Sequence, residues 1–119
     1  MPLRCLIVDD SRRFGDEARG LLEQEGISVV GIAASGEDAV RLAKALRPDL
    51  ALVDINLGKE SGFDVARRLA ESSNPPLAVI FVSTYDEREF SARIAASPAL
   101  GFIAKTELSA ERIRELLRE

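Results

Sequence analysis

The stretch LIVDD, residues 6–10, places three apolar residues directly before two adjacent carboxylates, Asp9 and Asp10. A continuous apolar run of this kind is typical of a strand that is buried on both faces of a parallel sheet. Two unit anions ~4 Å apart repel each other by ~4 kcal/mol at an effective dielectric constant of ~20. The stretch therefore predicts a buried strand whose end faces a site that balances negative charge.

Four more short apolar runs, rich in Val and Ile, follow residues 3–8 along the chain: 27–34, 50–54, 77–83 and 100–105. Together the five runs predict five parallel strands, because antiparallel strands with one solvent-exposed face would alternate apolar and polar residues. The segments between them carry apolar residues at helical spacing. The sequence is thus one of alternating strands and helices.

Five helices are predicted from this spacing and from capping residues. The first carries an apolar stripe and stops before Gly26; the stripe comprises Phe14, Ala18, Leu21 and Leu22. The signals at the starts of the others are Ser35 with Asp38, Ser61 with Asp64, Asp86 with Glu89, and Ser109. Strands that alternate with helices predict a single doubly wound (βα)₅ domain over residues 1–119, of the α/β class, with helices on both faces of an open sheet.

The composition argues against several classes of function. The chain has 119 residues, 46% apolar and 30% charged, with a net charge of −4, which argues against nucleic-acid binding by this domain. No apolar run is long enough to span a membrane or act as a secretory signal, so a cytoplasmic location is expected. The single cysteine, Cys5, excludes an internal disulfide, and the lack of histidine excludes Ser-His and Cys-His catalysis.

Polar side chains gather where the predicted strands end. Asp9 and Asp10 follow the first strand, Asp54 ends the third, Ser83 ends the fourth and Lys105 follows the fifth. In open α/β sheets the working site lies beyond the carboxyl ends of the strands. Three carboxylates there need a cation, and oxygen ligands without His or Cys favour Mg²⁺.

These residues suggest phosphoryl chemistry. Asp54 could act as a carboxylate nucleophile that takes up a phosphoryl group. Mg²⁺ and Lys105 would neutralise the charge on the transferred oxygens, and Ser83 could donate a hydrogen bond to them. The neighbouring Thr84 competes with Ser83 for that role. No Gly-rich phosphate loop precedes a helix, which argues against nucleotide binding by that route.

Four motifs in this order resemble the receiver domain of two-component response regulators, over essentially the whole chain. They are LIVDDS (6–11), LVDINLGKESGFD (52–64), FVST (81–84) and GFIAK (101–105). The resemblance implies a flavodoxin-like sheet of strand order 2-1-3-4-5. It also implies a regulatory domain rather than an enzyme, one that assists its own phosphorylation and dephosphorylation.

The resemblance assigns roles to the acidic residues. It implies that Asp54 accepts a phosphoryl group from a phosphohistidine on a partner histidine kinase or phosphotransfer protein. Asp10, Asp54 and the backbone carbonyl of Asn56 would bind Mg²⁺, with Asp9 acting through water. Lys105 would contact the phosphoryl group.

The resemblance further implies a conformational switch and residues that control how long the phosphorylated state lasts. Ser83 and Phe102 would form the switch, which shifts the surfaces that follow the fourth and fifth strands. Asn56 and Tyr85 would flank the phosphoryl group and set how fast it is lost. Ser83 stands where Thr is commoner in the family, Phe102 where Tyr is frequent, and Thr106 where many members have Pro.

The stretch KTEL (105–108) resembles receivers joined to helix-turn-helix DNA-binding domains, which suggests a transcriptional output from an effector domain after residue 119. A homodimer formed on phosphorylation fits that subfamily. The first helix, near Arg12, Arg13 and Phe14, is the expected docking face for the kinase because it borders the acidic site.

Two alternatives stay open at this point. A haloacid-dehalogenase-like phosphatase would carry a second Asp two residues after the nucleophile, where this chain has Asn56. A pseudo-receiver, which acts as a phosphate-independent interaction domain, usually lacks part of the acidic set, and that set is complete here.

Overall fold

The computed structural model describes residues 2–73, 77–84 and 87–118. Its main sheet is parallel, with the strand order β2-β1-β3-β6-β7. These strands are β1 (Leu3–Val8), β2 (Ile27–Ala33), β3 (Leu50–Asp54), β6 (Ala78–Ser83) and β7 (Gly101–Ala104). With β6 and β7 counted as the fourth and fifth strands of this sheet, the order is the predicted 2-1-3-4-5.

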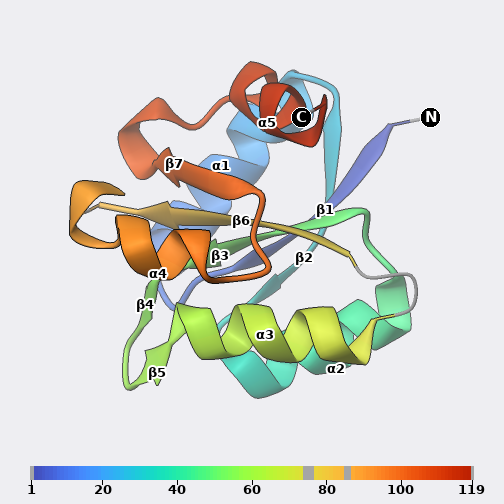
Figure 1. Ribbon diagram of the computed structural model, residues 1–119. Helices are drawn as coiled ribbons and strands as arrows, with labels where there is room; N and C mark the ends of the chain where they lie inside the picture. Colours follow the sequence, from blue (N-terminus) through green and yellow to red (C-terminus); the bar gives the residue numbers. More distant parts are fainter. Residues whose placement is uncertain (1, 74–76, 85–86, 119) are drawn as a thin grey trace.

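Helices cover both faces of the sheet (Figure 1). They are α1 (Arg12–Gln24), α2 (Gly36–Leu46), α3 (Gly62–Ser72), α4 (Ser91–Ala95) and α5 (Ala110–Arg118). Short 3₁₀ turns cover Glu87–Glu89 and Lys105–Glu107. Among the described residues, no helix combines the length and the apolar character that crossing a bilayer requires.

The core lies in two layers because the side chains of each strand alternate between the faces. On one face, strand residues such as Leu6, Val53 and Phe81 pack with residues of α2, α3 and α4. On the other face, Ile7 and Leu52 pack with residues of α1 and α5. Both faces of β1 and β3 are therefore buried, which explains why their sequences are apolar without alternation.

Serine side chains cap helices at Ser35 and Ser61, as predicted, and at Ser11, which was not predicted. Ser11 caps α1, and its Oγ accepts a hydrogen bond from Phe14 N. Ser35 accepts one from Asp38 N, as its spacing predicts. Ser61 accepts one from Phe63 N, one residue earlier than the predicted capping box would place it.

Two other details differ from the prediction. Leu21 of the predicted apolar stripe is 37% exposed, because Ala18 and Leu22 carry the buried face of α1. The fourth helix begins only at Ser91, after a 3₁₀ turn and without a side-chain cap. The predicted start of that helix at Asp86 lies outside the described residues.

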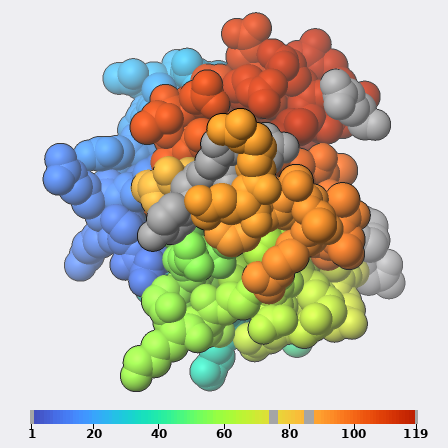
Figure 2. All heavy atoms as spheres, turned by 60° about the vertical axis from the view of Figure 1, so that its left-hand side comes forward, coloured from blue at the N-terminus to red at the C-terminus, as the bar shows by residue number. Residues whose placement is uncertain are grey.

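A two-stranded hairpin, which the sequence pattern does not predict, follows β3. Its strands are β4 (Asn56–Leu57) and β5 (Glu60–Ser61), paired antiparallel. The view in Figure 2 brings forward the edge at which the strands of the main sheet end. On this face the blue region of α1, the green hairpin region and the orange segment around α4 come to the surface near one another (Figure 2).

Candidate phosphoryl and metal site

Three carboxylates converge at the carboxyl ends of β1 and β3, as predicted. Asp9 and Asp10 follow β1 and Asp54 is the last residue of β3, and one carboxylate oxygen from each lies within 4.8 Å of the others. Asp9 is 1% exposed and Asp54 is 7% exposed, whereas Asp10 is exposed at the rim. The site is thus a buried acidic floor with one solvent-facing carboxylate.

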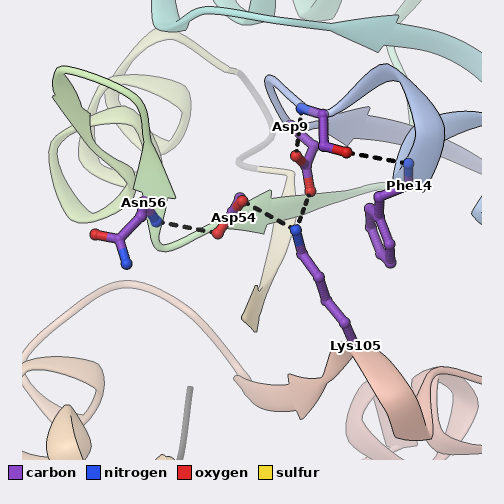
Figure 3. A network of polar contacts seen from close by, with 6 residues as sticks. Asp9, Phe14, Asp54, Asn56 and Lys105 are labelled. Carbon is purple, nitrogen blue, oxygen red and sulfur yellow. Dashed lines mark hydrogen bonds and ion pairs between the residues drawn. The ribbon is translucent and has the colours of Figure 1, made fainter. Parts of the chain in front are cut away.

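Backbone groups hold one oxygen of each buried carboxylate. Asp9 Oδ1 accepts a hydrogen bond from Ser11 N at 2.8 Å, in the turn that leads into α1. Asp54 Oδ1 accepts one from Asn56 N at 3.0 Å, in the turn that leads into β4. The side chains are therefore fixed by the same turns that redirect the chain at the ends of the strands (Figure 3).

The second oxygens of these carboxylates face Lys105, which lies in the 3₁₀ turn after β7. Lys105 Nζ lies 2.8 Å from Asp9 Oδ2 and 3.1 Å from Asp54 Oδ2 (Figure 3). The lysine side chain is only 13% exposed. Part of the repulsion between the carboxylates is thus balanced by an ammonium from a distant part of the chain.

The protonation of two groups reflects this environment. Burial raises the pKa of Asp54, and the neighbouring Asp9 charge raises it further, against the opposing effects of Asn56 N–H and Lys105. Burial alone would lower the pKa of Lys105, but its contacts with Asp9 and Asp54 outweigh burial and raise it. The lysine is therefore held in its charged form.

The donor set fits Mg²⁺. Three carboxylates with one ammonium leave an excess of negative charge, and the cluster contains only oxygen donors, which hard cations prefer. Asp9 Oδ2 has no partner among the described residues that meets hydrogen-bond geometry, although Lys105 Nζ forms an ion pair with it. This buried oxygen could therefore accept a hydrogen bond from a water molecule bound to the ion.

A glycine leaves room beside the Asp10 carboxylate at the rim of the site. Gly58, at the tip of the hairpin, has a φ of +61°, which favours glycine. A Cβ at this position would lie 3.1 Å from Asp10 Oδ2 and would crowd that carboxylate. The carbonyl of Asn56, the remaining predicted ligand, is carried by the same hairpin.

The hairpin is fastened to α2. Glu60 Oε1 accepts a hydrogen bond from Gly36 N at 2.9 Å, at the first residue of α2. The N-terminus of a helix attracts a carboxylate, because its backbone N–H groups have no partner within the helix. Glu60 could not be identified from the sequence, because nothing in its local pattern indicates a contact with a helix that begins 24 residues earlier.

Ser83 and Phe102, the predicted switch residues, lie on neighbouring strands. Ser83 ends β6 and is 1% exposed; the residue before it, Val82, pairs with Asp54. Phe102 is 7% exposed and packs in the core layer beneath α2, α3 and α4. Phe102 is thus inward in this structure. Tyr85, the predicted lifetime residue, lies outside the described residues.

Comparisons with known proteins identify what the chain is similar to. A family model described as the response regulator receiver domain matches residues 5–118. Sensory transduction protein LytT of Bacillus cereus is 34% identical over 98% of this chain and 46% of its own length. Response regulator GacA of Pseudomonas aeruginosa is 35% identical over 87% of this chain and 48% of its own length. The chain spans about half the length of these curated relatives.

Solved structures give the same picture. The receiver domain of the putative response regulator NarL from Mycobacterium tuberculosis superposes with a TM-score of 0.83 at 29% identity, covering 98% of this chain and 94% of that one. The response regulator domain of CheB from Thermotoga maritima gives 0.82 at 25% identity, covering 99% and 96%.

Proposed function

The chain belongs to the response regulator receiver domain family, and we propose that it is a switch in which Asp54 accepts a phosphoryl group from a histidine kinase or phosphotransfer partner. One observation carries this proposal. The Asp54 carboxylate lies at the end of a central strand, 3.1 Å from an ammonium and within 4.8 Å of two further carboxylates. A receiver domain is a regulatory domain, and this chain is proposed to act as one.

The chemistry is a single in-line transfer. An Asp54 oxygen attacks phosphorus, and the bond from phosphorus to the donor's imidazole nitrogen breaks. That nitrogen keeps the electron pair and later takes up a proton. Lys105, which already contacts Asp54, neutralises charge on the transferred oxygens.

Mg²⁺ would be held by Asp10, Asp54 and the backbone carbonyl of Asn56, with Asp9 acting through water. When bound, the ion supplies positive charge to the phosphoryl oxygens. Asp10 is the exposed carboxylate of this set and is reachable from solvent. A site with so few protein ligands keeps several waters, so weak binding in the absence of phosphate is expected.

Labelling with a small phosphodonor tests the assignment of Asp54. With Mg²⁺ and acetyl phosphate, the protein should gain the mass of one phosphate, and Asp54→Asn should gain none. Asp64→Asn is a matched control, because Asp64 is exposed and forms an ion pair with Arg67 on the surface of α3. Full labelling of the Asp54→Asn protein would falsify the assignment. A wild-type protein that no donor labels would favour the pseudo-receiver.

We propose that phosphorylation changes the surfaces that follow β6 and β7, and that these surfaces transmit the signal. Phosphorylation adds about −1.5 to −2 charge, which can draw Ser83 toward the phosphoryl group. Phe102 would then rotate into the space that is left. Amide exchange and chemical shifts over residues 83–105 should change on phosphorylation, and an unchanged pattern would exclude this switch.

The lifetime of the phosphorylated state is proposed to depend on Asn56 and Tyr85. Asn56 can position the water that attacks phosphorus, whereas Tyr85 is bulky and can cover its approach. Tyr85→Ala should shorten the lifetime, and Asn56→Ala should lengthen it or leave it unchanged. Phosphate loss from purified phosphorylated protein in Mg²⁺ measures both effects.

The partner is proposed to dock on the start of α1, which borders the acidic site. Phe14, Leu21 and Leu108 line a pocket of about 410 Å³ there, next to Lys105. A homodimer formed on phosphorylation, a cytoplasmic location and a transcriptional output are further proposals. The last is supported by relatives such as the transcriptional regulatory protein PdtaR of Mycobacterium tuberculosis.

A further inference from the structure

The ring of Phe14 lies against the ammonium of Lys105. Lys105 Nζ is 4.4 Å from the ring centroid of Phe14, a distance typical of a cation–π contact. The same Nζ contacts Asp9 Oδ2 and Asp54 Oδ2. In Figure 3 the carboxylate of Asp54 and the ring of Phe14 lie on different sides of this nitrogen. The ammonium is thus enclosed by two carboxylates and an aromatic ring.

The backbone fixes where this ring stands. Ser11 caps α1, and Phe14 N donates the capping hydrogen bond to Ser11 Oγ at 3.2 Å. Phe14 therefore lies in the first turn of α1, a few residues after the acidic pair that follows β1. The turn that orders Asp9 also orders Phe14, since Ser11 N donates to Asp9 Oδ1.

Open space lies beside this contact. Phe14 and Lys105 both line the pocket of about 410 Å³, together with Ser11, Thr84, Thr106 and Leu108. Lysine has a long, flexible stem and a strongly hydrated head, so it gains conformational freedom and water when nothing restrains it. Without the ring, the ammonium would keep its two carboxylate contacts but would have room to move relative to them toward the pocket.

We propose that Phe14 is a positioning residue, which holds the ammonium of Lys105 over Asp54 through the face of its ring. The inference rests on the proposed function, in which Lys105 neutralises the transferred phosphoryl group. It is separate from any role of Phe14 in docking a kinase, because it concerns the reaction with a small donor as well. The chemistry of the step is unchanged; Phe14 acts only through Lys105.

The position of the lysine can be measured directly by NMR in the unphosphorylated, metal-free protein. A ring face shifts nearby protons upfield, so the ε protons of Lys105 should resonate upfield of those of Lys44 and Lys59, the other two lysines of the chain. Phe14→Leu should remove this shift, because it keeps an apolar side chain but has no ring. Phe14→Tyr should retain it.

The effect on phosphoryl transfer is measured as the rate of labelling by acetyl phosphate in Mg²⁺. Phe14→Leu should slow labelling by about three- to tenfold, the range expected for the loss of one partly buried cation–π contact. Phe14→Tyr should stay within about twofold of the wild type, because tyrosine offers the same ring face. Gly20→Ala, on the exposed side of the same helix and outside the pocket, should react at the wild-type rate.

The outcomes separate the two proposals. If wild-type protein is labelled and Phe14→Leu is labelled equally fast, or if the Lys105 protons are not shifted, Phe14 does not position Lys105. If no donor labels the wild type, the proposed function fails, but the NMR shift still decides where Lys105 is held. If Phe14→Leu lowers the unfolding midpoint markedly, Phe14→Ile serves as a second variant without an aromatic ring, and the same NMR shift and labelling rate are measured on it.

Discussion

Lys105 Nζ lies 2.8 Å from Asp9 Oδ2, and the side chain of Asp9 has no exposure to solvent. Taking a carboxylate out of water costs several kcal/mol unless a counter-charge and hydrogen bonds compensate. Here Ser11 N–H bonds one oxygen and Lys105 faces the other. In the metal-free protein, this lysine therefore has a structural role at the acidic site in addition to its proposed chemical one.

Replacing the lysine tests that role. Lys105→Met should lower the free energy of unfolding of the metal-free protein by about 3 kcal/mol, because it leaves a buried carboxylate without its cation. Added Mg²⁺ should recover part of the loss by binding the folded state. Urea unfolding with and without Mg²⁺ measures both effects. Lys59→Met, at an exposed position of the hairpin, is the control, and equal stabilities of the two variants would contradict the prediction.

The exposed carboxylate should behave in the opposite way. Asp10→Ala should raise the unfolding free energy of the metal-free protein by up to about 1 kcal/mol, because it removes one of three repelling charges. It should also abolish Mg²⁺-dependent phosphorylation. The gain should shrink as salt screens the repulsion. Asp16→Ala, on the exposed side of α1, serves as the control; if Asp10→Ala is labelled at the wild-type rate, the metal is held elsewhere.

Much of this arrangement could be predicted from the sequence. The runs that form β1 and β3 are apolar on both faces, so their identity as buried parallel strands was visible. Parallel strands end at one edge, which brings Asp9 and Asp54 together without any knowledge of packing. The family resemblance, and not the residues themselves, provided the strand order.

Other features could not be predicted because they depend on contacts between distant segments. The β4–β5 hairpin has strands of two residues, too short to show any periodicity. The contacts of Glu60 with Gly36 and of Phe14 with Lys105 join elements that are far apart in the sequence. Leu21 fits the helical stripe, yet the angle at which α1 packs leaves it partly exposed.

Cys5 should report on unfolding through its thiol. Burial raises the pKa of the Cys5 thiol from 9.0 to about 12, so the folded protein keeps it protonated and inaccessible to thiol reagents. Below about pH 9 the thiol is protonated in both the folded and the unfolded protein, and its burial contributes fully to stability. Between about pH 9 and 12 only the unfolded thiol ionises, which favours unfolding, so this contribution is lost as the pH rises.

The unfolding free energy of the wild type should accordingly fall more steeply above about pH 9 than that of Cys5→Ala, by about 1 kcal/mol per pH unit. The lysines and the tyrosine titrate in both proteins, so their effect on the pH dependence of stability is the same in each and does not enter the comparison. Chemical denaturation across this pH range provides the measurement. Rapid labelling of folded Cys5 at neutral pH, or parallel pH profiles, would show that the thiol is not buried.

Substitution by alanine should have opposite effects on stability at two glycines, Gly62 and Gly20. Gly62 is the first residue of α3, and its N–H donates to Ile55 O at 2.7 Å. A Cβ at Gly62 would collide with the backbone carbonyl of Asp54 and lie 2.7 Å from Ile55 Cα. Gly20 lies on the exposed side of α1, and nothing stands within 4 Å of the Cβ that it lacks.

Gly62→Ala should therefore destabilise the protein by about 3 kcal/mol, because only a movement of the backbone at the phosphoacceptor could relieve the collision. It should also slow labelling by acetyl phosphate, since Asp54 would shift relative to Lys105. Gly20→Ala should stabilise the protein by about 0.5–1 kcal/mol, because alanine favours the helix and meets no neighbour. Urea unfolding and labelling rates of both variants, measured side by side, check the pair. If Gly62→Ala is as stable and as reactive as the wild type, α3 does not begin against the Asp54 backbone.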